Sequence, residues 1–592
     1  MRHRPMVMGT RGVVVAGHYL AAAAGHRIAL EGGNAVDIAA AAGLALSVVE
    51  PQENSPGGEV PILVYSAKEK KVFAVSGVGW SPRAFTIDWC RTHGIDLIPG
   101  DGYLPACVPA VVGTWAEALA RFGTMSLAQV LQPAIELADD GFAAYPALCQ
   151  AIEGHRRKLQ ERYPSTCKVY LPDGRVPAVG QRLRNPDLAA MFRTLCRAEA
   201  QAAGRGRIAG IAAARDAFYR GPIAERIVEF IRANPVLDDS GASHAGLLDC
   251  DDLAEWRAAV EQPVSLNYRG LDVHKCPSWT QGPVFLQQLA ILDGLDLRAM
   301  GHNSAEYVHA RLEAAKLAFA DREAHYGDPA LDDVPFDVLL SKDYAAGRCG
   351  LIGPAASMEM RPGDVGRGLP DCDLWDVRAD NRRALGLDGP AGDPGAASAS
   401  DTTHLDVVDA EGNMVAATPS GGWFTASPLI DGLGFALGTR GQMFYLNPRR
   451  PNALAGRKRP RATLTPTLVT RAGRPWLAFG VRGGDMQDQT TLQFFLSHVD
   501  FGMDLAEALD APTFWTEHFP SSFYPRQAAA GRAWLENTFD PAVIEALQAR
   551  GHDVAVMDAL SLKMMAVARD ETSGVLRGGV CATGQQAHAL AW

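Results

Sequence analysis

Two adjacent threonines, Thr402 and Thr403, lie where an irregular segment meets the start of an apolar strand. Residues 351–401 are rich in proline, glycine, alanine and aspartate and show no periodicity, which is typical of a flexible linker. Residues 405–408 then begin a strand that turns and returns within 411–418. A threonine at such a junction can supply a hydroxyl nucleophile and, once N-terminal, its own amine as the base. Self-cleavage and an ordinary polar strand start both fit this pattern.

Composition and charge narrow the class of protein. The chain has 592 residues, of which 47% are hydrophobic and 21% charged, as in soluble globular proteins. Length alone would suggest three or four domains of about 150 residues. The net charge of −11 disfavours nucleic acid and anionic membranes as partners, because both need a basic surface. Ten cysteines are scattered singly without zinc-like spacing, so we expect reduced thiols, no disulfide framework and no metal site.

The N-terminus lacks the features of a signal peptide. Arg2, His3 and Arg4 precede only a short apolar run before Arg11, without a small-residue cleavage site. No window of 18 uncharged apolar residues occurs, so no transmembrane helix is expected. We therefore expect a cytoplasmic protein.

Hydrophobic periodicity predicts a mixture of helices and hairpins around this junction. An alanine-rich helix over 35–49 is apolar on most faces, which predicts that it is buried. The region 145–260 is mostly helical in pattern, with a basic surface segment over 193–207. Other expected elements are strands at 13–16, 60–65 and 72–75 and helices at 127–138, 284–295 and 305–325.

Several segments, in order along the chain, resemble those of the γ-glutamyltransferases (glutathione hydrolases). Thr402-Thr403-His404 resembles the site at which these N-terminal-nucleophile hydrolases mature. The other matching segments are 31–37, 107–115, 313–329, 458–467, 477–484 and 501–512. Together they spread from about Val13 to Phe514, so the chain is identified as a divergent member of this family.

The resemblance implies an α+β fold, a four-layer αββα sandwich built as one intertwined unit. It also implies cleavage between Asp401 and Thr402. The products would be a large subunit of residues 1–401, including the linker at 351–401, and a small subunit of residues 402–592. We expect this self-derived heterodimer, which can dimerise further, to need no cofactor.

Family membership also implies roles for single residues. Thr402 aligns with the nucleophile, and Ser420 with a hydroxyl 18 positions later that hydrogen-bonds to it. Gly483 and Gly484 align with the glycines whose backbone N–H groups form an oxyanion hole. Glycine suits this role because it lets the backbone approach closely and adopt unusual angles.

The residues that hold a γ-glutamyl group are replaced. The arginine that binds the substrate's α-carboxylate in the family is Val78 here, and the aspartate that binds its α-amino group is Met443. A family asparagine is Gly422. The clamp for an amino acid head therefore differs, while the groups that break the amide are retained.

Two other positions are candidates for substrate binding. The family's paired serines are Ala462 and Thr463 here, and the second keeps a hydroxyl. Arg440 lies within the altered segment, and a guanidinium can bind a carboxylate through two parallel hydrogen bonds. A surface arginine in a loop is the alternative interpretation of Arg440.

These observations predict an autoprocessing threonine amidohydrolase or acyltransferase for γ-glutamyl or related short carboxylated amides, with water or an amine as acceptor. An acylase for a different amide, such as an oxamate or glutaryl amide, fits equally well. The alternative from another class is an unprocessed, non-catalytic binding protein on the same scaffold.

Overall fold

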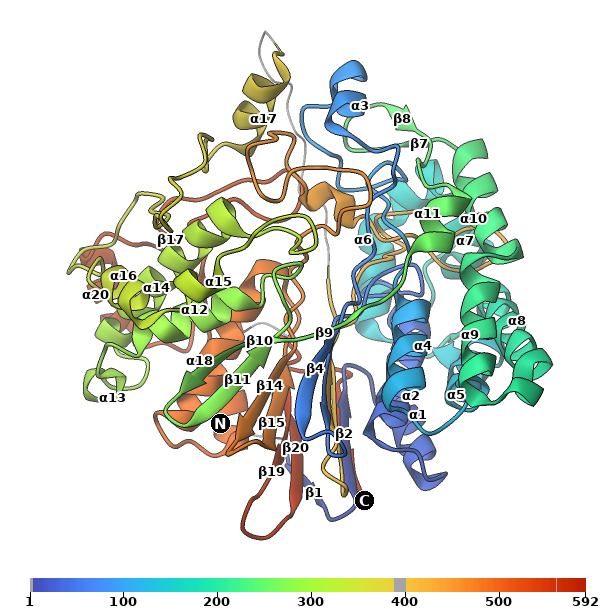
Figure 1. Ribbon diagram of the computed structural model, residues 1–592, viewed down its shortest axis with the longest axis horizontal. Helices are drawn as coiled ribbons and strands as arrows, with labels where there is room; N and C mark the ends of the chain where they lie inside the picture. Colours follow the sequence, from blue (N-terminus) through green and yellow to red (C-terminus); the bar gives the residue numbers. More distant parts are fainter. Residues whose placement is uncertain (1–3, 388–400, 560–561) are drawn as a thin grey trace.

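Two seven-stranded antiparallel sheets face each other at the centre of the computed structural model, which describes residues 4–387, 401–559 and 562–592 (Figure 1). The first sheet has the order β21 (His588–Ala591), β2 (Gly12–Ala16), β12 (Leu405–Asp409), β13 (Met414–Ala417), β3 (Ile62–Ser66), β4 (Lys71–Val75) and β9 (Val260–Glu261). The second has the order β1 (Val7–Gly9), β20 (Leu576–Val580), β19 (Met565–Arg569), β15 (Arg474–Gly480), β14 (Thr467–Arg471), β11 (Leu271–Lys275) and β10 (Val264–Tyr268).

Helices cover the outer face of each sheet. One set lies on the side of the first sheet and shares its hydrophobic core: α1 (Tyr19–Leu30), α2 (Ala35–Val49), α4 (Val111–Phe122), α5 (Leu127–Asp139), α8 (Pro186–Ala202) and α9 (Arg207–Tyr219). The other set packs on the second sheet: α12 (Pro283–Leu292), α14 (Ala305–His325) and α18 (Gln487–Val499). The two sets lie on opposite sides of the paired sheets in Figure 1. The protein therefore has the expected four-layer αββα architecture.

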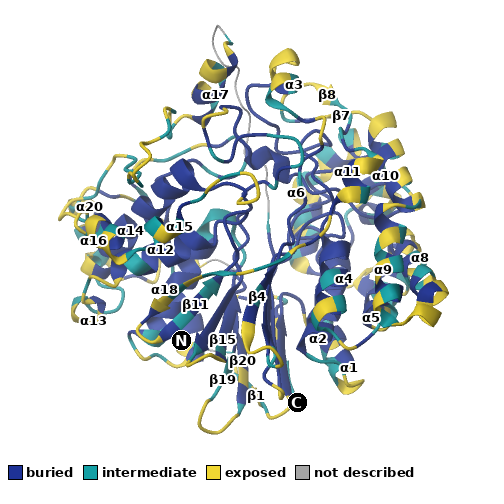
Figure 2. Ribbon diagram, viewed as in Figure 1, coloured by how far each residue is buried: buried dark blue, intermediate teal, exposed yellow. Residues whose placement is uncertain are grey.

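Strand β2 shows why the central strands are apolar on both faces. Val13 and Val15 pack between the two sheets, whereas Val14 and Ala16 pack against the helices of the first sheet. Successive side chains of a strand point to opposite faces, so a strand between two buried layers loses its polar alternation. The strands at the centre of Figure 2 are accordingly buried, and exposed residues are concentrated in the outer helices and loops.

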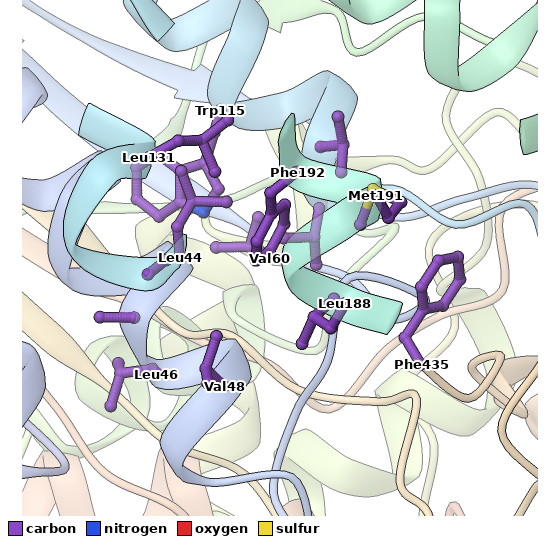
Figure 3. Close-up of a cluster of buried hydrophobic side chains, with 14 of the residues drawn as sticks. Leu44, Leu46, Val48, Val60, Trp115, Leu131, Leu188, Met191, Phe192 and Phe435 are labelled. Carbon is purple, nitrogen blue, oxygen red and sulfur yellow. The ribbon is translucent and has the colours of Figure 1, made fainter. Parts of the chain in front are cut away.

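Helix α2 is the centre of the helical layer beside the first sheet. It begins at a capping box, in which Asn34 accepts from the Asp37 N–H and the Asp37 side chain accepts from the Asn34 N–H. All of its residues are buried, as the alanine-rich pattern predicted. Leu44 and Val48 lie near Leu131 of α5 and residues of α8 in the cluster of Figure 3.

The segments before and after Asp401 are interleaved within the same sheets. Strand β12 lies between β2 and β13, and β13 in turn pairs with β3. Both chain ends also join the sheets, because β1 pairs with β20 and β21 pairs with β2. Two subunits produced by a cut after Asp401 would thus share both sheets and remain one intertwined unit.

The segment predicted as a linker contains an ordered helix, so that prediction is wrong for part of it. Helix α17 (Val377–Leu385) is capped by Asp376. Its Arg382 pairs with Asp96 at 2.7 Å, and Asn381 donates to the Asp96 carbonyl at 3.0 Å. Residues 388–400 lie outside the described part of the chain. None of the described helices is both long and apolar enough to cross a membrane.

Candidate active site

Thr402 lies just before β12, a central strand of the first sheet. Its backbone forms an antiparallel bridge with Ser420, and its side chain is buried. The Thr402 Oγ1 atom is 3.1 Å from Ser420 Oγ. The structure therefore brings together the two hydroxyl groups that the sequence placed 18 positions apart.

The peptide bond between Asp401 and Thr402 is held by several hydrogen bonds. The Thr402 N–H donates to Asp401 Oδ1 at 2.8 Å. The Asp401 carbonyl accepts from Ser420 Oγ at 2.9 Å and from Trp423 Nε1 at 2.8 Å. Both the nitrogen and the carbonyl oxygen of this peptide are thus fixed beside the Thr402 hydroxyl.

Gly483 and Gly484 border a cavity of about 600 Å³ that Asp401 also lines. Both glycines have positive φ, +116° and +55°, which side chains of L-residues rarely tolerate. The remaining lining is rich in aromatic rings: Trp515, Phe519, Phe523 and Tyr524. The cavity can therefore receive a molecule with an apolar part next to Asp401, the residue before Thr402.

Buried polar residues from α14 and from the turn before α12 support the glycine loop. Gln281 donates to the Gly484 carbonyl at 3.4 Å and accepts from Arg322 at 2.7 Å. Arg322 also pairs with Asp485 at 2.5 Å. The Arg322 of the family-like segment 313–329 is therefore a positioning residue for the loop, with no contact to Thr402.

Arg482 connects the cavity to a buried charge cluster. It pairs with Asp401 Oδ2 at 2.5 Å and with Glu53 at 3.2 Å, and Lys563 bonds Glu50 at 2.5 Å and Glu53 at 2.7 Å. Burial raises the pKa of the Asp401 carboxyl to about 6 against the opposing charge of Arg482, and Glu53 adds to the rise. Burial, together with Glu50, likewise raises the pKa of Glu53.

Arg440 is buried beneath Ser420 rather than placed in a surface loop, so the alternative interpretation of it is wrong. Its Nη2 donates to Ser420 Oγ at 2.6 Å, and its Nε forms an ion pair with the buried Glu59. Arg440 does not line the cavity described above. Thr463 is also fully buried outside that lining, and its hydroxyl has no hydrogen-bond partner among the described residues.

Apolar side chains occupy the positions where the family resemblance leads one to expect the clamp for an amino acid. Val78 is 1% exposed and packs in the core between the sheets. Met443 is equally buried. A free ammonium or carboxylate at either position would have no charged partner from these residues.

One group in the described part of the chain consists of side chains of the types that bind metal ions. His309, Glu313 and His552 lie close together and are buried. The two imidazoles are hydrogen-bonded to each other, with His309 Nδ1 and His552 Nε2 2.8 Å apart. Glu313 is paired with Lys316 at 2.7 Å and Arg361 at 2.8 Å. The facing imidazole nitrogens and the Glu313 carboxylate are thus already occupied, and the two cations oppose a metal ion there.

Sequence reasoning did not find Trp423, Arg482, Glu53 or Lys563. Two of them had a positional signal, because Trp423 follows Ser420 by three residues and Arg482 immediately precedes the glycine pair. Glu53 and Lys563 come from opposite ends of the chain and had none.

Comparison with known proteins identifies the family. The family model described as gamma-glutamyltranspeptidase matches residues 21–589. The chain belongs to the γ-glutamyltranspeptidase family. It is therefore an enzyme of the γ-glutamyltransferase-like hydrolases, as the resemblance of its motifs implied.

Among relatives in the γ-glutamyltranspeptidase family, the chain is 32% identical to the glutathione hydrolase-like YwrD proenzyme of Bacillus subtilis, covering 97% of both chains. It is 33% identical to the acylase ACY 1 proenzyme of Pseudomonas sp. strain SE83, covering 97% of this chain and 92% of the relative. A solved structure of LmbA2991HD is 42% identical, with a TM-score of 0.91 and full coverage of both chains.

Proposed function

We propose that the protein cleaves itself between Asp401 and Thr402 and then acts as a threonine-nucleophile amidohydrolase. The observation that carries this proposal is the position of Thr402 Oγ1, 3.1 Å from Ser420 Oγ, next to a peptide that borders a cavity. The cut would leave two interleaved subunits of 401 and 191 residues. The relatives named as proenzymes support this maturation.

The cleaved protein would carry its own base on the nucleophile. The new α-amino group of Thr402 has an ordinary pKa of about 7.7–8.0, so it can accept the hydroxyl proton near neutral pH. Thr402 Oγ1 would attack the substrate amide to form an ester, which water or an amine then resolves. Gly483 and Gly484 would stabilise the oxyanion of the substrate through their N–H groups.

We further propose that the substrate is a short amide whose acyl group carries a carboxylate and lacks an α-ammonium. Burying an ammonium beside Met443 would leave it unpaired, at a cost of several kcal/mol. Arg482 is the only basic residue among the described residues that line the cavity. In the uncleaved chain it holds the Asp401 carboxylate, so we give it the role first expected of Arg440.

The relatives' names favour an acylase or a hydrolase of glutathione-like amides as the two candidate activities. The replaced positions at Val78 and Met443 favour the acylase. The aromatic rings of the cavity would contact an apolar part of such a substrate.

The test measures self-cleavage first and amide hydrolysis second. The purified protein should show chains of 401 and 191 residues, with the smaller chain beginning at Thr402 by mass spectrometry and N-terminal sequencing. Thr402→Ala should stay a single chain, and Thr403→Ala, a matched control, should be cleaved. The mature protein is then assayed with γ-glutamyl, glutaryl, succinyl and oxamate amides.

The outcomes separate the classes of function. A wild-type chain that stays intact on long incubation would favour the non-catalytic binding protein. Cleavage with fastest turnover of γ-glutamyl amides would retain the nucleophile but overturn the substrate proposal.

A further inference from the structure

Trp423 contacts the peptide that self-cleavage would break. Its indole Nε1 is 2.8 Å from the Asp401 carbonyl oxygen, and the Ser420 hydroxyl is 2.9 Å from the same oxygen. Donors at about 2.7–3.1 Å from the oxygen that becomes negative are the geometric requirement of an oxyanion hole. We infer that Trp423 is a catalytic residue of self-cleavage, in an oxyanion hole separate from the Gly483–Gly484 pair. This inference rests on the proposed maturation between Asp401 and Thr402.

The hydrogen bonds of Ser420 fix the direction of its proton. A hydroxyl has one proton to donate and two lone pairs that accept. Arg440 can only donate, so its contact of 2.6 Å uses one lone pair of Ser420 Oγ. If the Thr402 hydroxyl donates to the other lone pair, the Ser420 proton is left for the Asp401 carbonyl. Arg440 thus positions Ser420 as a donor to the same oxygen as Trp423.

The indole of Trp423 is held in place on several sides. The side chain is 1% exposed, and the Arg440 guanidinium lies 5.0 Å from its ring. Nε1 also lies 2.9 Å from the Glu53 carbonyl. The N–H is therefore shared between two acceptors, so it keeps a partner when the Asp401 carbonyl moves away after cleavage.

The other atoms of the peptide are held as firmly. Asp401 Oδ1 accepts from the Thr402 N–H, while Oδ2 pairs with Arg482. The side chain of Asp401 therefore fixes its own peptide plane relative to Thr402. No hydrogen bond joins the Asp401 carbonyl to Gly483 or Gly484 within the described structure, which separates the two sets of oxyanion donors.

The self-cleavage reaction balances in atoms and electrons without a cofactor. Thr402 Oγ1 forms a bond to the Asp401 carbonyl carbon, and the carbonyl π pair moves onto the oxygen held by Ser420 and Trp423. When the C–N bond breaks, its electron pair stays on the Thr402 nitrogen, which takes up the proton that the hydroxyl lost. Water then hydrolyses the resulting ester, which releases the Asp401 carboxylate and restores the Thr402 hydroxyl.

The test compares two tryptophan substitutions in the full chain. Trp423→Phe keeps a ring for the Arg440 contact but removes the N–H. Loss of one oxyanion donor typically costs about 10²- to 10³-fold in rate, and we expect this fall in the first-order rate constant of self-cleavage. Trp534→Phe is the matched control, because the Trp534 N–H has no hydrogen-bond partner among the described residues and lies in the separate strand β17 (Arg532–Glu536).

Two further measurements separate catalysis from folding. Trp423→Phe is also made in a Thr402→Ala background, where an unfolding temperature close to that of Thr402→Ala alone shows that the fold is kept. If Trp423→Phe does not fold, benzothienylalanine at position 423 replaces the N–H by sulfur with little change in shape. After complete cleavage, the kcat/KM of the Trp423→Phe enzyme should fall far less than its rate of self-cleavage.

Each outcome is decisive. Wild-type cleavage together with an equally fast Trp423→Phe chain overturns this inference and leaves the proposed function intact. An equal loss of maturation and turnover would make Trp423 a structural residue and also overturn it. An uncleaved wild-type chain would overturn the proposed function and this inference together.

Discussion

Arg440 donates a hydrogen bond of 2.6 Å to Ser420, whose oxygen lies next to the Thr402 hydroxyl. The same guanidinium forms an ion pair with the buried Glu59. Arg440 therefore belongs to the group of side chains around the proposed nucleophile. Self-cleavage should depend on it, although the sequence alone suggested that Arg440 would act only on the substrate.

We expect Arg440→Ala to slow self-cleavage and to destabilise the protein. The substitution leaves Glu59 buried without its cation, and breaking a buried ion pair in this way costs about 3–5 kcal/mol. It also removes the donor that orients Ser420. The measurements are a time course of cleavage on denaturing gels and the temperature of thermal unfolding. Arg440→Lys, which keeps the charge, should recover part of both.

The exposed Arg83 offers a comparison, since its ion pairs with Asp249 and Asp251 lie at the surface. Arg83→Ala should change both quantities little, because ion pairs at the surface contribute little to stability. Cleavage of Arg440→Ala at the wild-type rate would show that Ser420 is oriented without it.

Local sequence patterns predicted single elements well. The alanine-rich run predicted α2, and the turn at 411–413 predicted the hairpin of β12 and β13. The position of β12 between β2 and β13 depends on pairing across almost 400 residues, which periodicity does not encode. Helix α17 was missed because it is short and polar and is held by contacts to the distant Asp96.

The residues of the candidate site also fall into those that the sequence predicted and those that only the structure shows. The resemblance of motifs gave Thr402 and Ser420, and the structure places their hydroxyl groups in contact. The role of Arg482 depends on where Asp401 and Glu53 meet it in space. Trp423 could be recognised only from the structure, because its N–H points to the carbonyl of the residue before Thr402. The residue type alone does not give this direction.

Gly484→Val should reduce amide turnover by the mature enzyme. The φ of +55° is unfavourable for a β-branched residue, and a Cβ at this position would lie 2.8 Å from Phe523 Cε2. Displacing the backbone donors should cost on the order of 10²- to 10³-fold in kcat/KM. Gly473→Val is the matched control, because Gly473 also has positive φ but meets no atom within 4 Å. Near-normal turnover by Gly484→Val would mean that the loop is only a turn.

Arg482→Gln should weaken the binding of amides with a charged acyl group and leave the binding of neutral amides almost unchanged. A hydrogen bond to a charged group contributes about 1.5–3 kcal/mol, which corresponds to about a 10- to 150-fold rise in KM for a succinyl or glutaryl amide. The KM of a neutral amide of the same length should change little. Steady-state kinetics on fully cleaved enzyme gives both values, and Arg474→Gln on the exposed end of β15 serves as the control. An equal change for both amides would remove Arg482 from carboxylate binding.

His18 should make the protein less stable as the pH falls. Burial lowers the pKa of His18 to about 3, and the charge of Lys563 contributes to this shift. Nδ1 accepts from the Leu20 N–H at the start of α1, and Nε2 has no partner among the described residues. Between about pH 6.5 and 3 the unfolded chain binds a proton at this histidine that the folded chain does not. Stability that is complete above the unfolded pKa is therefore lost as the pH falls through this window.

We expect His18→Asn to remove this pH dependence while keeping an acceptor at the helix start. Asparagine is a good N-cap residue, so the bond to Leu20 can be retained. The smaller side chain loses the stacking on Tyr19, which lowers stability by an amount that does not depend on pH. Relative to wild type, the variant should gain about 2 kcal/mol in the free energy of unfolding between pH 7 and pH 5. Thermal unfolding of the two chains in the Thr402→Ala background would measure this difference. Parallel stability curves would mean that His18 accepts a proton in the folded protein as readily as in the unfolded chain.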